Sequence, residues 1–427
     1  MFMLLSTLCH GLAFGHTGAV MDSIDVVQPP GSSRLGIETS VGYIRQQESG
    51  FFEWNCHEAV TQTDALITPR YTESSDGIIL VTLGDMSQAR HPEESMYRSV
   101  DSCNWMPPSG LTGQQVSDVE FNPNDASTAL AITANESGPN FLFRSTDAGL
   151  TWTQASLEVH NRIFRTIQYA PGPDGSIWIS AVRYDTEEAW IYHSVDGGLT
   201  WVENALEVQS AGGLDVFVDV LIADNADIDT AWVVMGPWLD DRLLQTTDGG
   251  QTFAEVYTPG GDIIDGGQDD EGGLWLVTTG NKVIYSETGE FFFRVDTAPP
   301  SLGIEVSGEH VWLATRIPSE GSALSMSSDG VSFESIDAFD MLDGPPDCIA
   351  ETHSAALCDP LWAELRDSIA GTLDTADPVA EEPTASPDSA HQQGCCTGDA
   401  KRANVGLLAL MILALCRRAH HPSQGLT

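Results

Sequence analysis

Most of the side chains in this sequence that could take part in catalysis or metal binding are carboxylates. Asp and Glu number 62 against 18 Lys and Arg, so the formal net charge is −44. Carboxylate oxygens are the ligands that calcium prefers, and two loops concentrate them. Neither loop has the spacing of an EF-hand or of a nonapeptide calcium repeat, and we interpret both as solvated loops. The two groups are Asp224, Asp227 and Asp229, and Asp262, Asp265, Asp269 and Asp270.

Charge and motifs argue against several classes of protein. A nucleic-acid binder needs a basic patch to neutralise phosphates, whereas the only lysines are Lys282 and Lys401. The sequence contains no HExxH, no GxSxG and no phosphate-binding loop. We therefore predict no catalytic residue, no metal site and no cofactor. The expected protein is a monomeric binding or scaffold protein, not an enzyme, and its partner is an unknown surface protein or glycan.

Some of the acids recur at a fixed place in a repeat, S/T-x-D-x-G-x-T-aromatic. Three segments follow this pattern without exception: 145–152 (STDAGLTW), 194–201 (SVDGGLTW) and 246–253 (TTDGGQTF). Two further copies, 99–105 and 327–333, are one residue short. Segment 286–293 has lost the Asp, and segment 47–54 keeps little beyond Trp54. Three complete matches in one chain establish an internal repeat.

The residue types of the repeat are those of a tight hairpin turn. The Asp carboxylate accepts hydrogen bonds from backbone N–H groups across the turn, and Gly provides the positive φ that the turn needs. The aromatic side chain leaves the turn and packs between strands, where it buries a large area. These residues are therefore predicted to stabilise the fold and not to catalyse a reaction. They are Asp101, Asp147, Asp196, Asp248 and Asp329, with Trp105, Trp152, Trp201, Phe253 and Phe333.

The elements that carry the repeat are predicted to be strands. The terminal aromatics of the seven copies are 40 to 52 residues apart, a period typical of propeller blades. We predict an all-β, seven-bladed β-propeller over residues 16–345. Each blade has three strands before the aromatic and one after it. The more apolar strands, such as 78–83, 176–182 and 273–278, are predicted to be the innermost strands around the axis.

Four cysteines lie in the body of the chain, Cys56, Cys103, Cys348 and Cys358. An exported chain with four such cysteines is expected to form two disulfides. Three pairings are possible, and the repeat register favours Cys56–Cys103 and Cys348–Cys358. The second pair would close a short loop within residues 346–372. Helical spacing over 360–369 adds a short amphipathic helix to this C-terminal cap.

The two ends of the chain predict export. Residues 1–15 have an apolar run and a small-x-small cleavage site, as in a signal peptide, although the basic start is missing. A buried first strand is the alternative. Residues 373–394 are acidic and Pro-rich, which predicts a disordered linker. The tail 395–427 contains an apolar helix over 405–416, too short for a comfortable membrane span, followed by Arg417 and Arg418.

This tail resembles the MYXO-CTERM sorting signal of myxobacterial surface proteins. The resemblance lies in the acidic linker, the Gly-Cys pair, the short apolar helix and the terminal arginines. It implies that Cys395 or Cys396 is processed and lipidated, and that the tail anchors the protein at a membrane. The implied location is the cell surface or outer membrane of a bacterium. The match departs from the pattern in having few arginines and a non-basic end at 420–427.

The body, over residues 35–340, resembles the Asp-box (BNR or sortilin-like) propellers, which include sialidases, sortilin-type receptors and a photosystem II assembly factor family. Sialidases carry an Arg triad opened by Arg-Ile-Pro, together with a Tyr–Glu pair. Here Arg316-Ile317-Pro318 lies after the sixth aromatic and not before the first box, so we do not assign it this role. A glycan-processing hydrolase remains the alternative function. Three arginines and a Tyr–Glu pair at one mouth of the propeller would favour it.

Overall fold

The computed structural model describes residues 23–61, 69–83, 95–170, 175–183, 188–206, 216–237, 241–308, 310–316 and 320–375. The predicted signal peptide, the apolar tail helix and the sorting cysteines Cys395 and Cys396 lie outside these residues. Among the described residues, no helix combines the length and the apolar character needed to cross a membrane.

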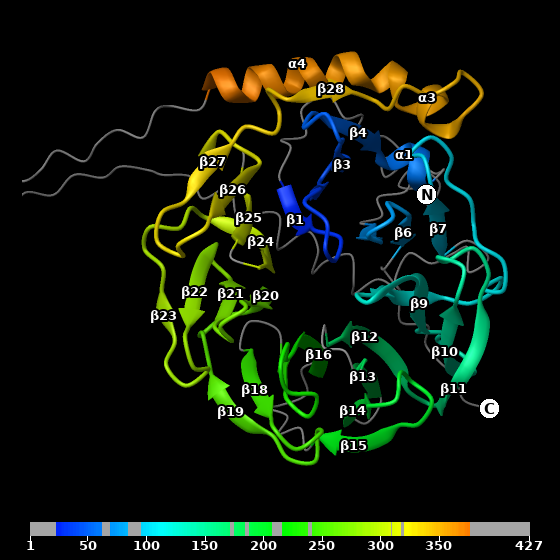
Figure 1. Ribbon diagram of the computed structural model, residues 1–427, viewed down its shortest axis with the longest axis vertical. Helices are drawn as coiled ribbons and strands as arrows, with labels where there is room; N and C mark the ends of the chain where they lie inside the picture. Colours follow the sequence, from blue (N-terminus) through cyan, green and yellow to red (C-terminus); the bar gives the residue numbers. More distant parts are fainter. Residues whose placement is uncertain are drawn as a thin grey trace, which may run out of the picture. The chain divides into compact units, whose positions relative to one another are not determined.

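Seven sheets form a ring, which confirms the prediction of an all-β, seven-bladed propeller (Figure 1). Blade 1 contains β1 (Ser23–Val27), β2 (Gly36–Thr39), β3 (Gly42–Gln46), β4 (Phe52–Cys56) and the late strand β28 (Leu342–Gly344). Blade 2 contains β5 (Arg70–Glu73), β6 (Ile79–Thr82) and β7 (Met96–Ser99). Blade 3 contains β8 (Val116–Asn122), β9 (Asp125–Thr133), β10 (Pro139–Ser145) and β11 (Thr153–His160). The strands within each blade are antiparallel, except that β28 runs parallel to β4.

The other four blades have four strands each. Blade 4 contains β12 (Ile163–Tyr169), β13 (Ile177–Arg183), β14 (Glu188–Ser194) and β15 (Val202–Leu206). Blade 5 contains β16 (Val216–Ala223), β17 (Ala231–Pro237), β18 (Arg242–Thr246) and β19 (Ala254–Tyr257). Blade 6 contains β20 (Ile263–Gln268), β21 (Leu274–Thr278), β22 (Lys282–Ser286) and β23 (Phe293–Arg294). Blade 7 contains β24 (Ser301–Ser307), β25 (His310–Thr315), β26 (Leu324–Ser327) and β27 (Glu334–Ile336).

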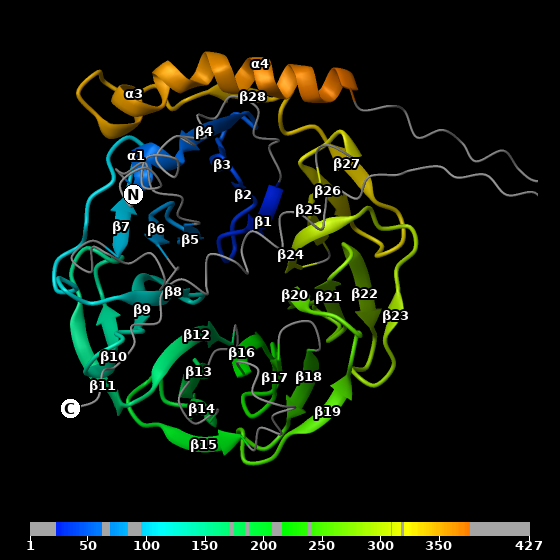
Figure 2. The ribbon, with the colours of Figure 1, turned by 180° about the vertical axis from the view of Figure 1, so that it is seen from behind.

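The first strand of each blade is the innermost strand, so the prediction that the apolar strands line the axis is wrong. Each first strand contacts the first strand of the next blade, and β24 contacts β1 to complete the circle (Figure 2). The apolar strands, such as β13 and β21, are second in their sheets. There both of their faces are covered by neighbouring blades, which explains their continuous apolar sequence. The first strands have one edge toward the axis and accordingly carry polar residues.

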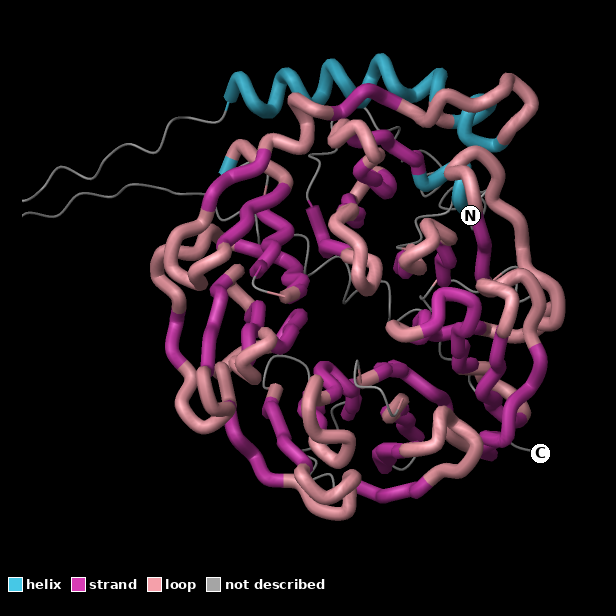
Figure 3. The backbone as a smooth tube through the Cα atoms, in the orientation of Figure 1, coloured by secondary structure: helices cyan, strands magenta, loops and turns pink. Residues whose placement is uncertain are grey.

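The ring is closed by the C-terminal part of the described chain. After blade 7 the chain returns to blade 1, where Leu342 pairs with Phe52 at the outer edge of the sheet. The helices α3 (His353–Leu357) and α4 (Asp359–Thr375) follow, and Figure 3 shows them along one side of the ring of blades. The short helix α1 (His57–Thr61) follows β4 and contacts α3.

The helix predicted over 360–369 is confirmed as part of α4. Its apolar side chains pack on the core of blade 1, where the ring of Trp362 lies 6.0 Å from that of Trp54. Leu361 and Leu365 join the same cluster. Gly344 of β28 has a φ of +116°, and a Cβ atom there would lie 3.1 Å from the Trp362 indole. The glycine therefore allows the helix to lie directly on the closing strand.

Both predicted disulfide pairings are wrong. The bonds join Cys56 to Cys358 and Cys103 to Cys348, with Cα–Cα distances of 5.4 and 5.6 Å. The segment between β28 and α4 crosses blades 1 and 2, and there it meets one cysteine of each blade. Ser354 in this segment donates its backbone N–H to the Cys103 carbonyl. The disulfides thus join the end of the propeller to its beginning, where the register argument had expected two local bonds.

Candidate functional site

The predicted Asp residues lie in the hairpin turns at the outer part of the blades. We call the segments 99–105, 145–152, 194–201, 246–253, 286–293 and 327–333 the box turns. In blade 4, Asp196 accepts hydrogen bonds from the Thr200 N–H (2.8 Å), the Thr200 hydroxyl (2.6 Å) and the Ser194 hydroxyl (2.9 Å). These bonds, led by that of the Thr200 hydroxyl, lower the pKa of Asp196 to about 2.

The other four Asp residues also accept hydrogen bonds from their own turns. Asp147 and Asp248 bind a Thr four residues ahead, at 151 and 252. In the two short turns, Asp101 and Asp329 bind N–H groups two and three residues ahead. The paired aromatics are buried at Trp105 and Trp152 and half-buried at Trp201, Phe253 and Phe333. None of these carboxylates is placed to act on a ligand, because each is occupied by its own turn.

A second set of carboxylates surrounds the axis, on the first strands. Asp118 of β8 accepts the N–H of its neighbour Val119 (2.9 Å) and that of Ile167 in the next blade (3.0 Å). Asp265 of β20 likewise accepts the N–H groups of Gly266 and Ile304, both at 2.8 Å. Each of these strands has a β-bulge at its Asp, which turns the carboxylate toward the neighbouring blade. These acids hold adjacent blades together.

Burial raises the pKa of several axial acids. The pKa is raised to about 6 for Asp118, about 7 for Glu38 and about 8 for Glu305. The guanidinium of Arg70 interacts with Glu38 and Asp118, among other acids. In β12, Arg165 binds both oxygens of Asp219 at 2.7 and 2.8 Å. Among the described residues, no three His, Cys, Asp or Glu side chains come together as a metal site.

These pKa values predict that stability falls as the pH rises above about 4. A free carboxyl group ionises near pH 4, so above this pH the folded chain retains protons that the unfolded chain has released, at Asp118 up to about pH 6, at Glu38 up to about pH 7 and at Glu305 up to about pH 8. Because the folded state then binds more protons, its stability is fully present below about pH 4 and is lost as the pH rises through 6 to 8. The melting temperature should fall by about 5 °C between pH 5 and 8.5.

Calorimetry in buffers of equal ionic strength measures this effect. Glu305→Gln should flatten the slope between pH 5 and 8.5, because the neutral amide carries no proton to lose. Glu334→Gln removes the same charge from an exposed strand and should leave the slope as it is, which controls for the change in net charge. Equal slopes in the two variants would show that Glu305 does not contribute to the pH dependence.

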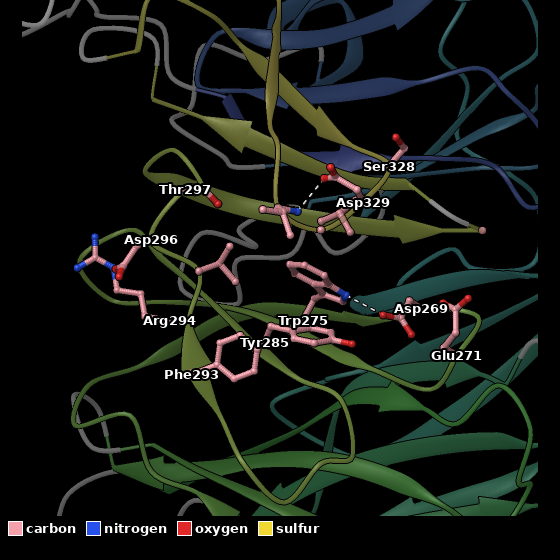
Figure 4. Close-up of a pocket in the computed structure, with 15 residues that line it drawn as sticks. Asp269, Glu271, Trp275, Tyr285, Phe293, Arg294, Asp296, Thr297, Ser328 and Asp329 are labelled. Carbon is pink, nitrogen blue, oxygen red and sulfur yellow. Dashed lines mark hydrogen bonds and ion pairs between the residues drawn. The ribbon is translucent and has the colours of Figure 1, made fainter.

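The third acidic group borders a cleft between blades 6 and 7, which we call the aromatic cleft. Its volume is about 670 Å³. One wall is a row of rings from blade 6: Tyr285 lies between Trp275 (ring centroids 4.4 Å apart) and Phe293 (5.5 Å). The other wall is the box turn of blade 7 at 328–331 (Figure 4). Asp269 and Glu271 border one end of the row, and Arg294 and Asp296 border the other.

The aromatic cleft is open because two repeats are incomplete. The outer strand β23 has only two residues, against eight in β11 of blade 3. Pro299 and Pro300 follow it, and proline cannot donate to a sheet. The box turn of blade 7 is one residue short and has Gly330 where blade 5 has Gly249 and Gly250. Less material is therefore available to fill the space between these blades.

The matching space between blades 4 and 5 shows how a complete repeat closes it. There the Trp178 ring is stacked on His193 at 3.8 Å. Asn204 of the outer strand donates to the Gly249 carbonyl at 3.3 Å, and Gly250 lies against the Trp178 ring. In the strand register of blade 6 the Asn204 position is taken by Val295, which pairs with Val283 as Asn204 pairs with Ile191. The valine side chain cannot make this hydrogen bond.

Asp269 fixes the inner end of the aromatic row. Its carboxylate accepts the indole N–H of Trp275 at 3.0 Å and the Gly273 N–H at 2.6 Å. The corresponding indoles of Trp178 and Trp232 are buried and find no acceptor among the described residues. Trp275 is only 4 % exposed, whereas Phe293 is 55 % exposed. The row therefore runs from a fixed, buried ring to a ring that is open to solvent.

Sequence reasoning missed this cleft and found only some of its parts. It placed Asp269 in a solvated loop and Asp329 in a box turn, and it read residues 273–278 simply as an apolar strand. The Asp224, Asp227 and Asp229 loop is a set of local turns, in which Asp224 accepts the Asp227 N–H and Asp227 accepts the Asp229 N–H. The usable signal was that the two least regular late repeats, 286–293 and 327–333, belong to adjacent blades.

A Tyr–Glu pair, the feature named for a sialidase-like site, does occur but is buried between blades 1 and 2. The Tyr43 hydroxyl donates to Glu73 at 3.4 Å, and Glu73 also binds Arg45 at 2.7 Å. Tyr43 and Glu73 are 0 and 2 % exposed, and the Tyr43 ring is stacked on Tyr71. Arg316 of the Arg-Ile-Pro segment follows β25, and Ile317 and Pro318 lie outside the described residues. A substrate has no access to the Tyr43 pair.

Comparison with known proteins assigns this chain to no family. No protein-family model and no curated protein matches the sequence. Solved structures do match, among them the extracellular domain of a putative one-component system from B. thetaiotaomicron, at 13 % identity and a TM-score of 0.49. That match covers 73 % of this chain and 39 % of the other. This chain therefore spans well under two thirds of that protein.

Two further similar structures are enzymes. A GH74 xyloglucanase from Xanthomonas campestris is 15 % identical, with a TM-score of 0.29 over 74 % of this chain and 64 % of the other. A prolyl endopeptidase is 13 % identical, with a TM-score of 0.48 over 74 % of this chain and 50 % of the other. The prediction that this chain is not an enzyme is thereby contradicted, because propellers of this kind occur in enzymes. Likeness at this level concerns the fold alone, and the fold does not determine activity.

Proposed function

We propose that this chain is an exported, surface-displayed binding propeller that holds its ligand in the aromatic cleft between blades 6 and 7. The single observation that carries the proposal is the open row of Trp275, Tyr285 and Phe293 facing the short box turn of blade 7. Because the blades are repeats of one another, the same space can be compared between different pairs of blades. Between blades 4 and 5 it is occupied by Asn204 and the Gly249 carbonyl that it binds, whereas between blades 6 and 7 it is open.

The composition of the cleft supports a ligand role. Ligand pockets typically have volumes of about 300 to 1,000 Å³ and combine apolar walls with a few placed polar groups. Here the wall is aromatic, and the polar groups stand at its two ends. Phe293 and Val331 are 55 and 61 % exposed on opposite sides. Exposed apolar side chains on facing walls lose water-accessible area when a ligand enters, which favours binding.

Export and surface display rest on the cysteines and the two ends of the chain. Disulfides persist in oxidising compartments, and Cys56–Cys358 and Cys103–Cys348 are both formed in this structure. In this proposal, residues 1–15 direct export as a signal peptide, and the tail 395–427 anchors the protein at the membrane. The Cys395 and Cys396 side chains are the proposed attachment points.

A panel of probes on the secreted full-length chain tests the cleft. The probes are a neutral oligosaccharide, an organic cation, an organic anion and a neutral aromatic fragment, each at millimolar concentration. At least one class should shift the NMR signal of the Trp275 indole N–H. Ser328→Trp places a large ring in the cleft and should abolish that shift. Val195→Trp is the matched control, because it occupies the same position in the box turn of blade 4.

The proposal fails under either of two results. If no probe class shifts the Trp275 signal, the cleft is not a ligand site. If a probe binds equally well to the wild type and to Ser328→Trp, its site lies elsewhere. A folded Ser328→Trp variant is required for the second comparison, and its melting temperature should match that of Val195→Trp.

A further inference from the structure

Most of the charged side chains around the aromatic cleft are negative. Its lining includes the carboxylates of Asp269, Glu271, Asp296 and Asp329 and one basic side chain, Arg294. The Arg294 guanidinium lies 3.2 Å from Asp296, so these two opposite charges offset each other and add little net charge to the cleft. Asp329 is occupied by its own turn, which leaves Glu271 and the outer part of Asp269 as the acids nearest the ring row. A ligand that enters meets a negative potential, in a chain whose net charge is −44.

The aromatic row adds a second attraction for positive charge. The face of an aromatic ring is electron-rich, and a cation within about 6 Å of the ring centroid is attracted to it. The half-buried ring of Tyr285 and the exposed ring of Phe293 lie along one wall, whereas Trp275 is only 4 % exposed. The attraction grows when the cation loses its water, as it does between two walls. The acids and the rings therefore favour the same kind of ligand.

The pKa of the Tyr285 hydroxyl is shifted in the direction that a negative potential produces. Its pKa is raised, first by burial and then by the charges of Asp269, Glu287 and Glu271. Each of these acids opposes the formation of a further negative charge at the hydroxyl. The same field stabilises a positive charge placed beside the ring.

We propose that the aromatic cleft recognises an organic cation, a protonated or quaternary amine carried on a short apolar stem. The stem packs on Tyr285 and Phe293, and the cationic group lies toward Glu271 at the inner end. This inference rests on the proposed function, because it names the ligand class of the same cleft. It assigns Tyr285 and Glu271 as the residues that select for charge.

A pair of probes of equal shape tests the inference. Choline and 3,3-dimethyl-1-butanol differ only in having a charged nitrogen or a neutral carbon at the centre of the trimethyl group. Calorimetric or NMR titration of the full-length chain should find choline bound at least about tenfold more tightly. Raising the salt concentration should weaken choline binding and leave the alcohol unchanged, because salt screens only the charge.

Variants test whether the preference for choline arises in the aromatic cleft. Glu271→Gln should weaken choline binding several-fold without changing the binding of the alcohol. Glu290→Gln removes the same charge from the box turn of blade 6, outside the cleft lining, and should change neither. Tyr285→Leu keeps an apolar wall but removes the ring face, and should weaken choline about tenfold. If that variant is unstable, Ser328→Trp gives the same loss from the opposite wall.

The outcomes separate this inference from the proposed function. If choline and the alcohol bind equally in the cleft, or if only a neutral oligosaccharide binds there, the inference is overturned and the binding function stands. If no probe binds, both fall. When choline is preferred, cadaverine and acetyl-Gly-Lys-Gly-amide identify the source. Tighter binding of the tripeptide indicates a lysine side chain of a polypeptide, and tighter binding of cadaverine indicates a free amine.

Discussion

Replacing Glu73 with Gln is expected to lower the free energy of unfolding by about 3 to 5 kcal/mol, the usual loss when one partner of a buried ion pair is removed. Glu73 is 2 % exposed and Arg45 is 8 % exposed. Arg45 reaches Glu73 through both Nε and Nη2, and Arg34 lies 3.6 Å away. Glu73→Gln leaves Arg45 with neutral acceptors in place of the carboxylate, namely the Gln amide oxygen, the Gly77 carbonyl and the Ser102 hydroxyl.

Urea unfolding of the full-length chain measures this loss, and two variants interpret it. Asp296→Asn breaks the exposed pair with Arg294 and should change the stability by less than about 1 kcal/mol. The double variant Arg45→Met/Glu73→Leu removes both buried charges and should be more stable than Glu73→Gln, because no charge is left without a partner. A Glu73→Gln variant as stable as Asp296→Asn would contradict the role of this pair in joining blades 1 and 2.

Removal of the Cys56–Cys358 disulfide should have an effect of similar size. The two cysteines are 302 residues apart in the sequence, and a cross-link restricts the unfolded chain more when it closes a longer loop. Cys56→Ser/Cys358→Ser is expected to lower the free energy of unfolding by about 2 to 5 kcal/mol. The bond also holds α3 and α4 against blade 1, so its loss should expose β28 to hydrogen exchange.

The pairing itself can be tested with the same four cysteines. Cys56→Ser/Cys358→Ser breaks one bond, whereas Cys56→Ser/Cys103→Ser breaks both. The second double variant should therefore melt at a lower temperature than the first. With the local pairing that the repeat register suggests, the first variant would break both bonds and the second only one. A higher melting temperature of the second variant, or a Cys348–Cys358 peptide in a non-reducing digest of the wild type, would therefore favour that pairing.

The aromatic cleft lies where incomplete repeats occur in two adjacent blades. The complete box turns of blades 3, 4 and 5 make the same local bonds at Asp147, Asp196 and Asp248. Blade 6 lacks the Asp, and blade 7 lacks one residue of the turn. Departures from a repeat are expected where a repeat protein binds something, because the regular sequence already satisfies the fold. The proposed site lies where two such departures meet.

The sequence alone determined the features that are built from neighbours in the chain. A complete box turn spans eight residues, and the partners of Asp196 lie within four residues of it. The seven repeat copies, with terminal aromatics 40 to 52 residues apart, predicted seven blades. The amphipathic pattern of Leu361, Trp362 and Leu365 predicted α4 for the same reason, since a helix repeats every few residues. Local chemistry of this kind does not depend on the rest of the fold.

Only the tertiary structure decided what lies next to what. Cys56 meets Cys358 because the ring of blades closes and not because of any spacing in the sequence. The ring row of blade 6 faces the turn at 328–331 because consecutive blades pack face to face, which brings these side chains together. The innermost strands could not be told apart by apolar content, since burial on both faces makes the second strands the most apolar. The polar first strands surround the axis, and their acids join blades through backbone N–H groups about 40 to 50 residues away. Contacts between blades are set by how the folded blades pack, and the repeat pattern alone shows which blades are adjacent but not which of their side chains meet.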